Sequence, residues 1–172
     1  MALEIQTHLF KDDGVIPNND RLPLVLYRSA IRDLPGSRPE QAFKRLFESN
    51  DWGGTWVNGI YDFHHYHGCS HEVLGIAAGS ADVQFGGPTG AVLTVQAGDA
   101  VVIPAGVGHC RQDTRPGLVV VGAYPRGQED VDLKRANARD RAEALSEIPN
   151  VALPDLDPVA GSGAGLPLIW PV

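Results

Sequence analysis

Residues 59–79 read GIYDFHHYHGCSHEVLGIAAG, and this stretch holds four of the six histidines of the chain. Side chains of a strand alternate between its two faces, so His65 and His67 share one face, about 6.6 to 7 Å apart at the backbone. Two imidazoles at this spacing can reach one metal ion at about 2.0 to 2.2 Å. Residues 68–71 then form a tight turn and Glu72 begins the returning strand. We therefore expect the Glu72 carboxylate to face the same interior.

A second stretch supplies the remaining candidate ligand. Residues 98–109 read GDAVVIPAGVGH, which predicts a strand, a turn at Pro104 and Gly106, and a histidine that begins the next strand. His109 is therefore the fourth candidate ligand. The alternative is a set of buried polar residues that hold no ion. Metal binding is favoured, because three imidazoles and a carboxylate facing an interior without an ion would be costly to desolvate.

The spacing of these residues resembles the two conserved motifs of the cupin superfamily. The first motif is matched at Gly59, His65, His67, Glu72 and Gly79. The second is matched at Gly98, Pro104, Gly106 and His109. Its last position is commonly Asn in the family, whereas this chain has Asp113. The rest of the chain, including its closing Leu-Pro-Leu-Ile-Trp, resembles more closely the YjlB-like bacterial cupins.

The resemblance implies an all-β fold, the cupin double-stranded β-helix or jelly-roll barrel. It also implies one divalent metal ion inside one end of the barrel, bound by His65, His67, Glu72 and His109. An ion that prefers six ligands would keep two positions open for water, oxygen or a bidentate substrate. Manganese, iron, nickel, zinc, cobalt and copper are not distinguishable by the sequence.

Turn signals and hydrophobic spacing predict the elements of one domain over residues 1–172. Short β-favouring runs separated by glycine-rich turns place the barrel core at about residues 53–126. Flanking helices are expected at both ends of this core, and the chain closes in an extended arm. The predicted pieces are strands at 3–10 and 22–27, a helix at 37–50 capped by Ser37, a helix at about 129–148 capped by Asp130, and the arm at 149–172. Trp170 suggests that the arm docks, either on its own barrel or on a neighbouring subunit.

Two residues are candidates for catalysis beside the ion. Tyr61 and Phe63 share the face of His65, so they are expected to line the cavity, where the Tyr61 hydroxyl could donate a proton; packing in the core is the alternative. Arg111 and Asp113 share the face of His109 in a regular strand. Arg111 could bind a substrate carboxylate through a forked pair of hydrogen bonds, or it could form an internal ion pair with Asp113.

The remaining histidines and cysteines of this region are not expected to bind the ion. His64 and His71 have the opposite parity, which favours positions at the surface or behind the ligands. Cys69 lies in the turn, either reaching the cavity or filling space. Cys110 follows His109 and should face away from it.

Composition excludes several classes of function. The 172 residues include 14 basic and 21 acidic side chains, a net charge of −7 that disfavours nucleic acid and anionic lipid. No apolar run approaches the roughly 20 residues of a membrane span. Two cysteines cannot form a disulfide framework, and the first residues do not resemble a secretory signal, so we expect a cytoplasmic protein.

These observations predict a metal-binding cupin that acts on or binds a small polar metabolite, such as a keto acid, an enediol or a sugar derivative. As an enzyme it would be a dioxygenase, an isomerase or a decarboxylase, because one fold hosts all three. The alternatives are a non-catalytic small-molecule binder and a structural dimer unit with a vestigial site. We expect a homodimer and no nucleic-acid or membrane partner.

Overall fold

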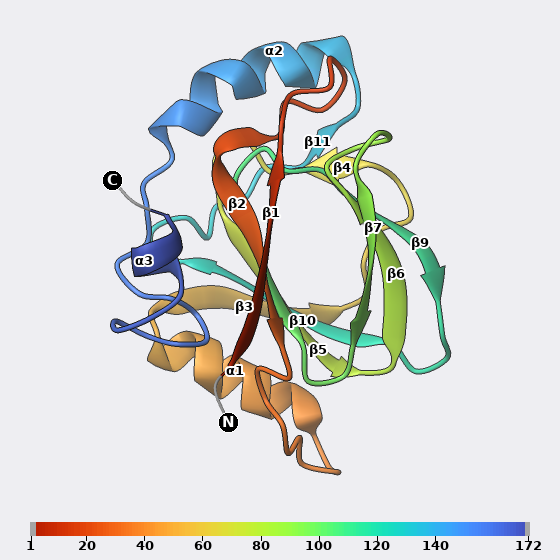
Figure 1. The fold of residues 1–172 in the computed structure, drawn as a ribbon, viewed down its shortest axis with the longest axis vertical. Coiled ribbons are helices and arrows are strands. Elements are labelled where there is room, and N and C mark those ends of the chain that lie inside the picture. Colours follow the sequence, from red (N-terminus) through yellow and green to blue (C-terminus); the bar gives the residue numbers. More distant parts are fainter. Residues whose placement is uncertain (1–2, 171–172) are drawn as a thin grey trace.

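The computed structural model describes residues 3–170, whose strands form two antiparallel sheets that face each other (Figure 1). The larger sheet has, in spatial order, β1 (Glu4–Phe10), β2 (Asn19–Arg28), β8 (Ala100–Ile103), β5 (Glu72–Ala78), β10 (Val119–Pro125) and β3 (Trp52–Asn58). The smaller has β11 (Lys134–Arg135), β4 (His65–Tyr66), β9 (His109–Thr114), β6 (Ser80–Phe85) and β7 (Ala91–Gln96). The predicted jelly roll is confirmed. The N-terminal strands β1 and β2, which lie outside the predicted core range of 53–126, extend the larger sheet.

Alternating side chains fill the space between the sheets. Leu74 and Ile76 point inward from β5, while Val83 and Phe85 point inward from β6, and all four are almost fully buried. Glu72 is on the same face of β5 as Leu74 because it lies two residues earlier. The hydrophobic alternation that builds the core thus also turns one carboxylate into the barrel.

Helix α1 (Pro39–Ser49) covers the outer face of the larger sheet. Its Phe43 and Phe47 are fully buried. The helix ends at the predicted place, but the prediction of Ser37 as the N-cap is wrong. The N-cap is Arg38, which has a left-handed conformation and makes no side-chain capping bond. Pro39 still occupies the first turn, where its missing N–H costs nothing.

The second helix begins later than predicted. Helix α2 spans Ala138–Glu147, and the side chain of Asn137, not Asp130, accepts the capping bond from the Asp140 amide. Residues 134 and 135 instead pair with β4 as strand β11, which prevents the helix from starting at residue 129. A short 3-10 helix, Ile148–Asn150, ends the segment at Pro149 as expected.

The C-terminal arm folds back onto its own barrel (Figure 1). It contains a short helix, α3 (Leu166–Ile169), and Trp170 is buried with its Nε1–H donating to the Pro23 carbonyl at 2.8 Å. This contact places Trp170 on its own barrel, the first of the two docking surfaces considered from the sequence. Among residues 3–170, no helix is long and apolar enough to cross a membrane.

Candidate metal centre

Three strands bring the candidate ligands to one end of the barrel. His65 on β4 lies directly opposite His109 on β9, while Glu72 begins β5 in the facing sheet. His67 follows β4 immediately. The ligand strand is shorter than the predicted 61–67, because residues 61–64 are irregular, with bends at residues 62 and 63. The two histidines nevertheless enter the interior, and both are buried.

The ring nitrogens converge on one carboxylate oxygen. The Nε2 atoms of His67 and His109 each lie 3.2 Å from Oε2 of Glu72. Ligand atoms of these three residues fall within 4.8 Å of one another. His65 is outside this group, and its ring centroid is 4.0 Å from that of His109 and 6.1 Å from that of His67. The structure therefore brings three of the four predicted ligands together, with the His65 ring tilted against that of His109.

Backbone carbonyls fix the tautomer of each imidazole. Nδ1 of His65 faces the Phe63 carbonyl at 2.9 Å, that of His67 the Asp132 carbonyl at 2.5 Å, and that of His109 the Val107 carbonyl at 3.2 Å. A carbonyl oxygen only accepts hydrogen bonds, so each Nδ1 must carry a hydrogen. Each neutral ring therefore presents a lone pair at Nε2, the arrangement of metal-binding histidines whose outer nitrogen is held by the protein.

This geometry requires positive charge between the rings and Glu72. In their neutral form, the two imidazoles direct lone pairs at a carboxylate oxygen, and that oxygen, Glu72 Oε2, is buried without a hydrogen-bond donor. Protons on the imidazoles or one divalent ion would supply the charge. Three nitrogens and one carboxylate oxygen are a donor set that suits a divalent transition metal. The residues present therefore fit a metal ion.

Burial and Glu72 set the protonation of the cluster. Burial, helped by neighbouring His109, lowers the pKa of His65 to about 3, so this ring is neutral. Burial also opposes the charge on His67, but the Glu72 carboxylate outweighs it and raises the pKa of His67 to about 9. For Glu72 burial would raise the pKa, yet His67 and His109 hold it well below its usual range. An ion entering this site must therefore displace the proton of His67.

A cavity of about 880 Å³ opens from the ligands and is lined by both polar and apolar side chains. Tyr124 and Trp56 belong to its wall, and no motif or spacing in the sequence singles them out. The Trp56 indole N–H donates to the Tyr124 hydroxyl at 2.8 Å, and the Tyr124 ring stands edge-on to His67. Gly122 lies beneath Trp56, where an added Cβ would come within 2.0 Å of the indole. Because Gly122 has no side chain, the Trp56 indole can pack at this position in the cavity wall.

Comparison with known proteins gives the family. No family model matches the chain. Over 170 residues the chain is 41% identical to the uncharacterized protein YjlB of Bacillus subtilis (strain 168), and the match covers 99% of each protein. The chain belongs to the YjlB family. Its two motifs and two facing sheets make this YjlB-family protein a cupin.

Two solved structures resemble this YjlB-family protein at low sequence identity. Acireductone dioxygenase from Bacillus anthracis, with a cadmium ion in its active centre, is 16% identical, with a TM-score of 0.38 over 52% of this chain and 60% of that one. A cupin 2 domain-containing protein from Halorhodospira halophila is 15% identical, with a TM-score of 0.36 over 86% of this chain and 79% of that one.

Of the four other side chains predicted near the ion, Tyr61 and Arg111 line the cavity of the YjlB-family protein. Phe63 does not, since its ring stacks on Tyr61 and carries the Arg135 guanidinium 3.5 Å above its centre. The expectation for Asp113 is wrong as well. A β-bulge in β9 shifts the register, so that Arg111 opposes Val83 whereas Asp113 opposes Asp82 and is exposed.

The bulge explains why simple alternation failed beyond Arg111. One extra residue reverses the faces of the strand, which turns Thr114 into the cavity in place of Asp113. The ion pair with Asp113, one of the two alternatives for Arg111, does not form; the Arg111 guanidinium instead lies 3.8 Å from the largely exposed Asp62 carboxylate.

The remaining histidines and cysteines stay outside the cluster, as predicted. His71 is a buried packing residue: its Nδ1 accepts from the Ala105 amide at 2.9 Å and its ring contacts Trp170, while burial lowers its pKa to about 4. His64 is half-buried and Cys110 faces away from the ligands, and neither lines the large cavity. Cys69 is exposed, and its thiol donates to Asp132 at 3.0 Å.

Proposed function

We propose that this cupin binds one divalent metal ion through His65, His67, Glu72 and His109 and holds a small polar metabolite in the cavity above it. The observation that carries the proposal is the approach of two Nε2 lone pairs to one buried carboxylate oxygen at 3.2 Å. His65 completes the set by a small movement of a ring that already contacts His109. When bound, a divalent ion would supply Lewis-acid or oxygen-activating chemistry to a ligand with adjacent oxygens.

Arg111 is placed to orient the acidic end of such a ligand. It lies two residues beyond His109 on the inner face of β9, about 6.6 to 7 Å along the strand. Its Nε donates to the Ile60 carbonyl at 3.0 Å, which holds the guanidinium at the cavity wall. The terminal nitrogens can then form a forked pair of bonds with a carboxylate. A keto acid or sugar acid fits this arrangement, and Tyr61 stands at the rim as a proton donor.

The metal is tested by analysis of native protein purified without a nickel column. We expect about one divalent ion per chain, and at least several-fold less in Glu72→Ala and in His65→Ala, with the β-sheet circular dichroism preserved. His64→Ala is the matched control, because this neighbouring imidazole lies outside the ligand group. Full metal occupancy in the Glu72 or His65 variant would refute the ligand set.

The ligand class is tested by thermal shift of the metal-loaded protein with a panel of 2-oxo acids, enediols and sugar acids. Arg111→Gln should weaken the binding of the acids, as reported by their thermal stabilisation of the protein, about tenfold or more, because it removes a charged, forked contact. The metal content should stay unchanged. Arg126→Gln, at an exposed surface pair with Asp51, is the control. Turnover of a stabilising compound separates an enzyme from a binding protein. Equal acid binding in wild type and Arg111→Gln would remove Arg111 from the proposal.

A further inference from the structure

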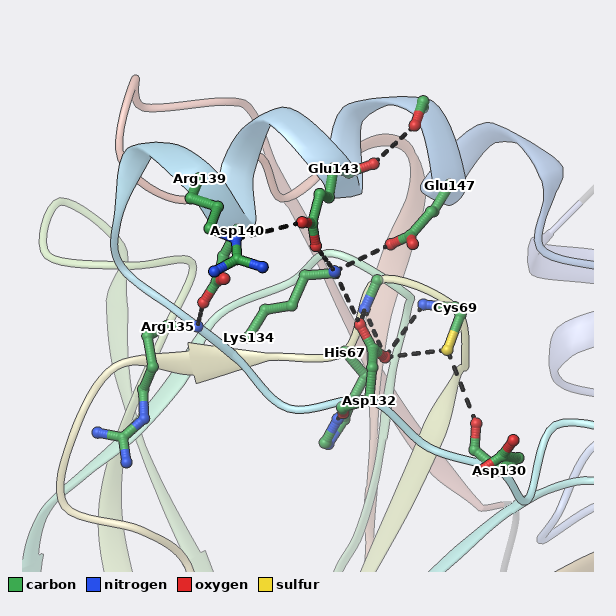
Figure 2. A network of polar contacts seen from close by, with 12 residues as sticks. His67, Cys69, Asp130, Asp132, Lys134, Arg135, Arg139, Asp140, Glu143 and Glu147 are labelled. Carbon is green, nitrogen blue, oxygen red and sulfur yellow. Dashed lines mark hydrogen bonds and ion pairs between the residues drawn. The ribbon is translucent and has the colours of Figure 1, made fainter.

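A buried lysine lies beside the ligand loop without touching a ligand. Lys134 on β11 is 6% exposed, and its ammonium group contacts three carboxylates: Asp132 at 3.5 Å, Glu143 at 3.1 Å and Glu147 at 3.2 Å. Figure 2 shows the lysine reaching from β11 toward α2, with the two glutamates descending from the helix and Asp132 on the side of His67. Such a buried cation needs partners, but three of them exceed what its own charge requires.

Asp132 joins this network to the candidate ligands. Its backbone carbonyl accepts the Nδ1–H of His67, which fixes that ring. Its carboxylate accepts from the Gly68 amide at 2.9 and 3.0 Å and from the Cys69 amide at 3.2 Å. One residue therefore holds both the imidazole and the two residues that follow it in the chain.

The backbone places Lys134 directly against the same loop. Lys134 pairs with Tyr66, and Arg135 pairs with His65, so β11 runs alongside the ligand strand. A Cβ added at Gly68 would lie 2.7 Å from the Lys134 Cε and 2.7 Å from a carboxylate oxygen of Glu147. The glycine thus permits a close approach between the loop and the lysine stem.

The charges make Asp132 depend on Lys134. Without the ammonium, three carboxylates would remain close together and repel one another. Glu143 and Glu147 are nearly half exposed and can turn into solvent, whereas Asp132 is more buried and is bound to the loop. The repulsion would therefore act mainly on Asp132 and would displace its backbone carbonyl, which holds the His67 ring.

We infer that Lys134 is a positioning residue of the metal centre, which fixes His67 through Asp132 and so makes helix α2 part of the site. This inference rests on the proposed metal binding. A purely structural role would also explain the network, but it would affect only the attachment of α2 to the barrel. The two roles differ in what happens to the bound ion.

The test uses the full chain loaded with Co²⁺, whose visible absorption reports its coordination. Lys134→Met keeps the stem and removes the charge. We expect about tenfold weaker Co²⁺ binding, at the low end of the 10- to 100-fold range for residues behind metal ligands, together with an altered spectrum. Lys134→Arg should restore both. Arg139→Met is the matched control, because Arg139 pairs with Glu143 at 3.5 Å and not with Asp132.

The outcomes separate the two proposals. Wild-type affinity and spectrum in Lys134→Met, with only a lower melting temperature, overturns the inference and leaves the metal site standing. Absence of Co²⁺ binding in wild type overturns both. If Lys134→Met does not fold, Asp132→Asn replaces it, since asparagine retains a side-chain oxygen for the Gly68 and Cys69 amides and loses the ion pair. A shifted spectrum then supports the inference, and an unchanged one overturns it.

Discussion

Glu72 is the residue on which the chemistry of the centre depends. Its Oε2 atom is shared by two imidazoles, His67 and His109, which come from the two different sequence motifs. A buried carboxylate in this position favours a positive charge beside it. The imidazole tautomers place that charge at the Nε2 atoms. Protons and metal ions therefore compete for the same place.

The competition predicts how metal affinity depends on pH. Because Glu72 raises the pKa of His67 to about 9 and the His65 pKa is about 3, His67 carries a proton near neutral pH that the ion must displace, whereas His65 carries none. The metal-free state binds more protons than the loaded state, so affinity rises with pH. We expect about a tenfold loss per pH unit from pH 8 to 6.

Calorimetric titration at pH 7 in two buffers of different ionisation enthalpy measures this release directly. About one proton per ion is expected. The ordinary imidazole pKa of about 6.5 would place the loss of affinity only below about pH 6. A flat affinity from pH 5 to 8 would contradict the assignment of His67 as a ligand.

Single residues show how far the sequence could predict this site. The spacing of His65, His67 and Glu72 identified the cluster because strand alternation and a short turn are local rules. Asp113 was misplaced because nothing in the sequence marks the bulge that reverses its face. Asp132 was missed for another reason: it fixes His67 through a backbone carbonyl, which every residue type possesses.

At the level of elements, the contact between α1 and β5 requires a glycine in the strand. Gly75 lies under Phe43, and an added Cβ would come within 2.3 Å of the phenyl ring. The helix is thus seated directly on the backbone of the strand that carries Glu72. The inner face of this strand carries the candidate ligand Glu72, and its outer face packs against the helix.

Gly75→Ala should destabilise the protein by about 1 to 3 kcal/mol, the usual cost of overpacking a filled core. Urea unfolding measures the change, with Gly36→Ala as the control because a Cβ added at Gly36 would have no neighbouring atom within 4 Å. Co²⁺ affinity should stay within about twofold of wild type. A stability equal to that of the control would show that Phe43 moves freely.

Element boundaries were less predictable than element types. The strand-rich core and two longer helices were expected from turn signals and hydrophobic spacing, but the second helix starts at Ala138 rather than near residue 129. Residues 130–137 could have begun a helix by their own propensity. Instead, Lys134 and Arg135 pair with β4 and Asp132 binds the ligand loop, tertiary contacts that no local stretch of sequence reveals.

For the molecule as a whole, the C-terminal arm is held by one buried carboxylate. Asp157 is fully buried and accepts from the amides of Val159 and Ala160 at 2.7 Å and of Leu166 at 2.9 Å, and from the Tyr27 hydroxyl. Together with Trp170, these bonds close the arm over the outer face of the larger sheet. Sequence alone predicted an arm that docks, but not this anchor.

Asp157→Ala should lower the free energy of unfolding by about 3 kcal/mol or more, because several buried donors lose their acceptor. Chemical unfolding followed by tryptophan fluorescence measures it, and the arm can detach first, giving an early transition. Asp155→Ala, at an exposed position in the same arm, should be nearly neutral. Equal stability of the two variants would show that the arm is held elsewhere.

Strand β4 has only two residues, and a single residue pair, His65 with His109, joins it to β9. That pair is also half of the proposed ligand set. An ion bound there would cross-link β4 and β9 where only this one pair joins them, whereas removal of the ion by a chelator would leave the two strands free to separate. Solvent would then reach the interior along the same route by which the ion departs.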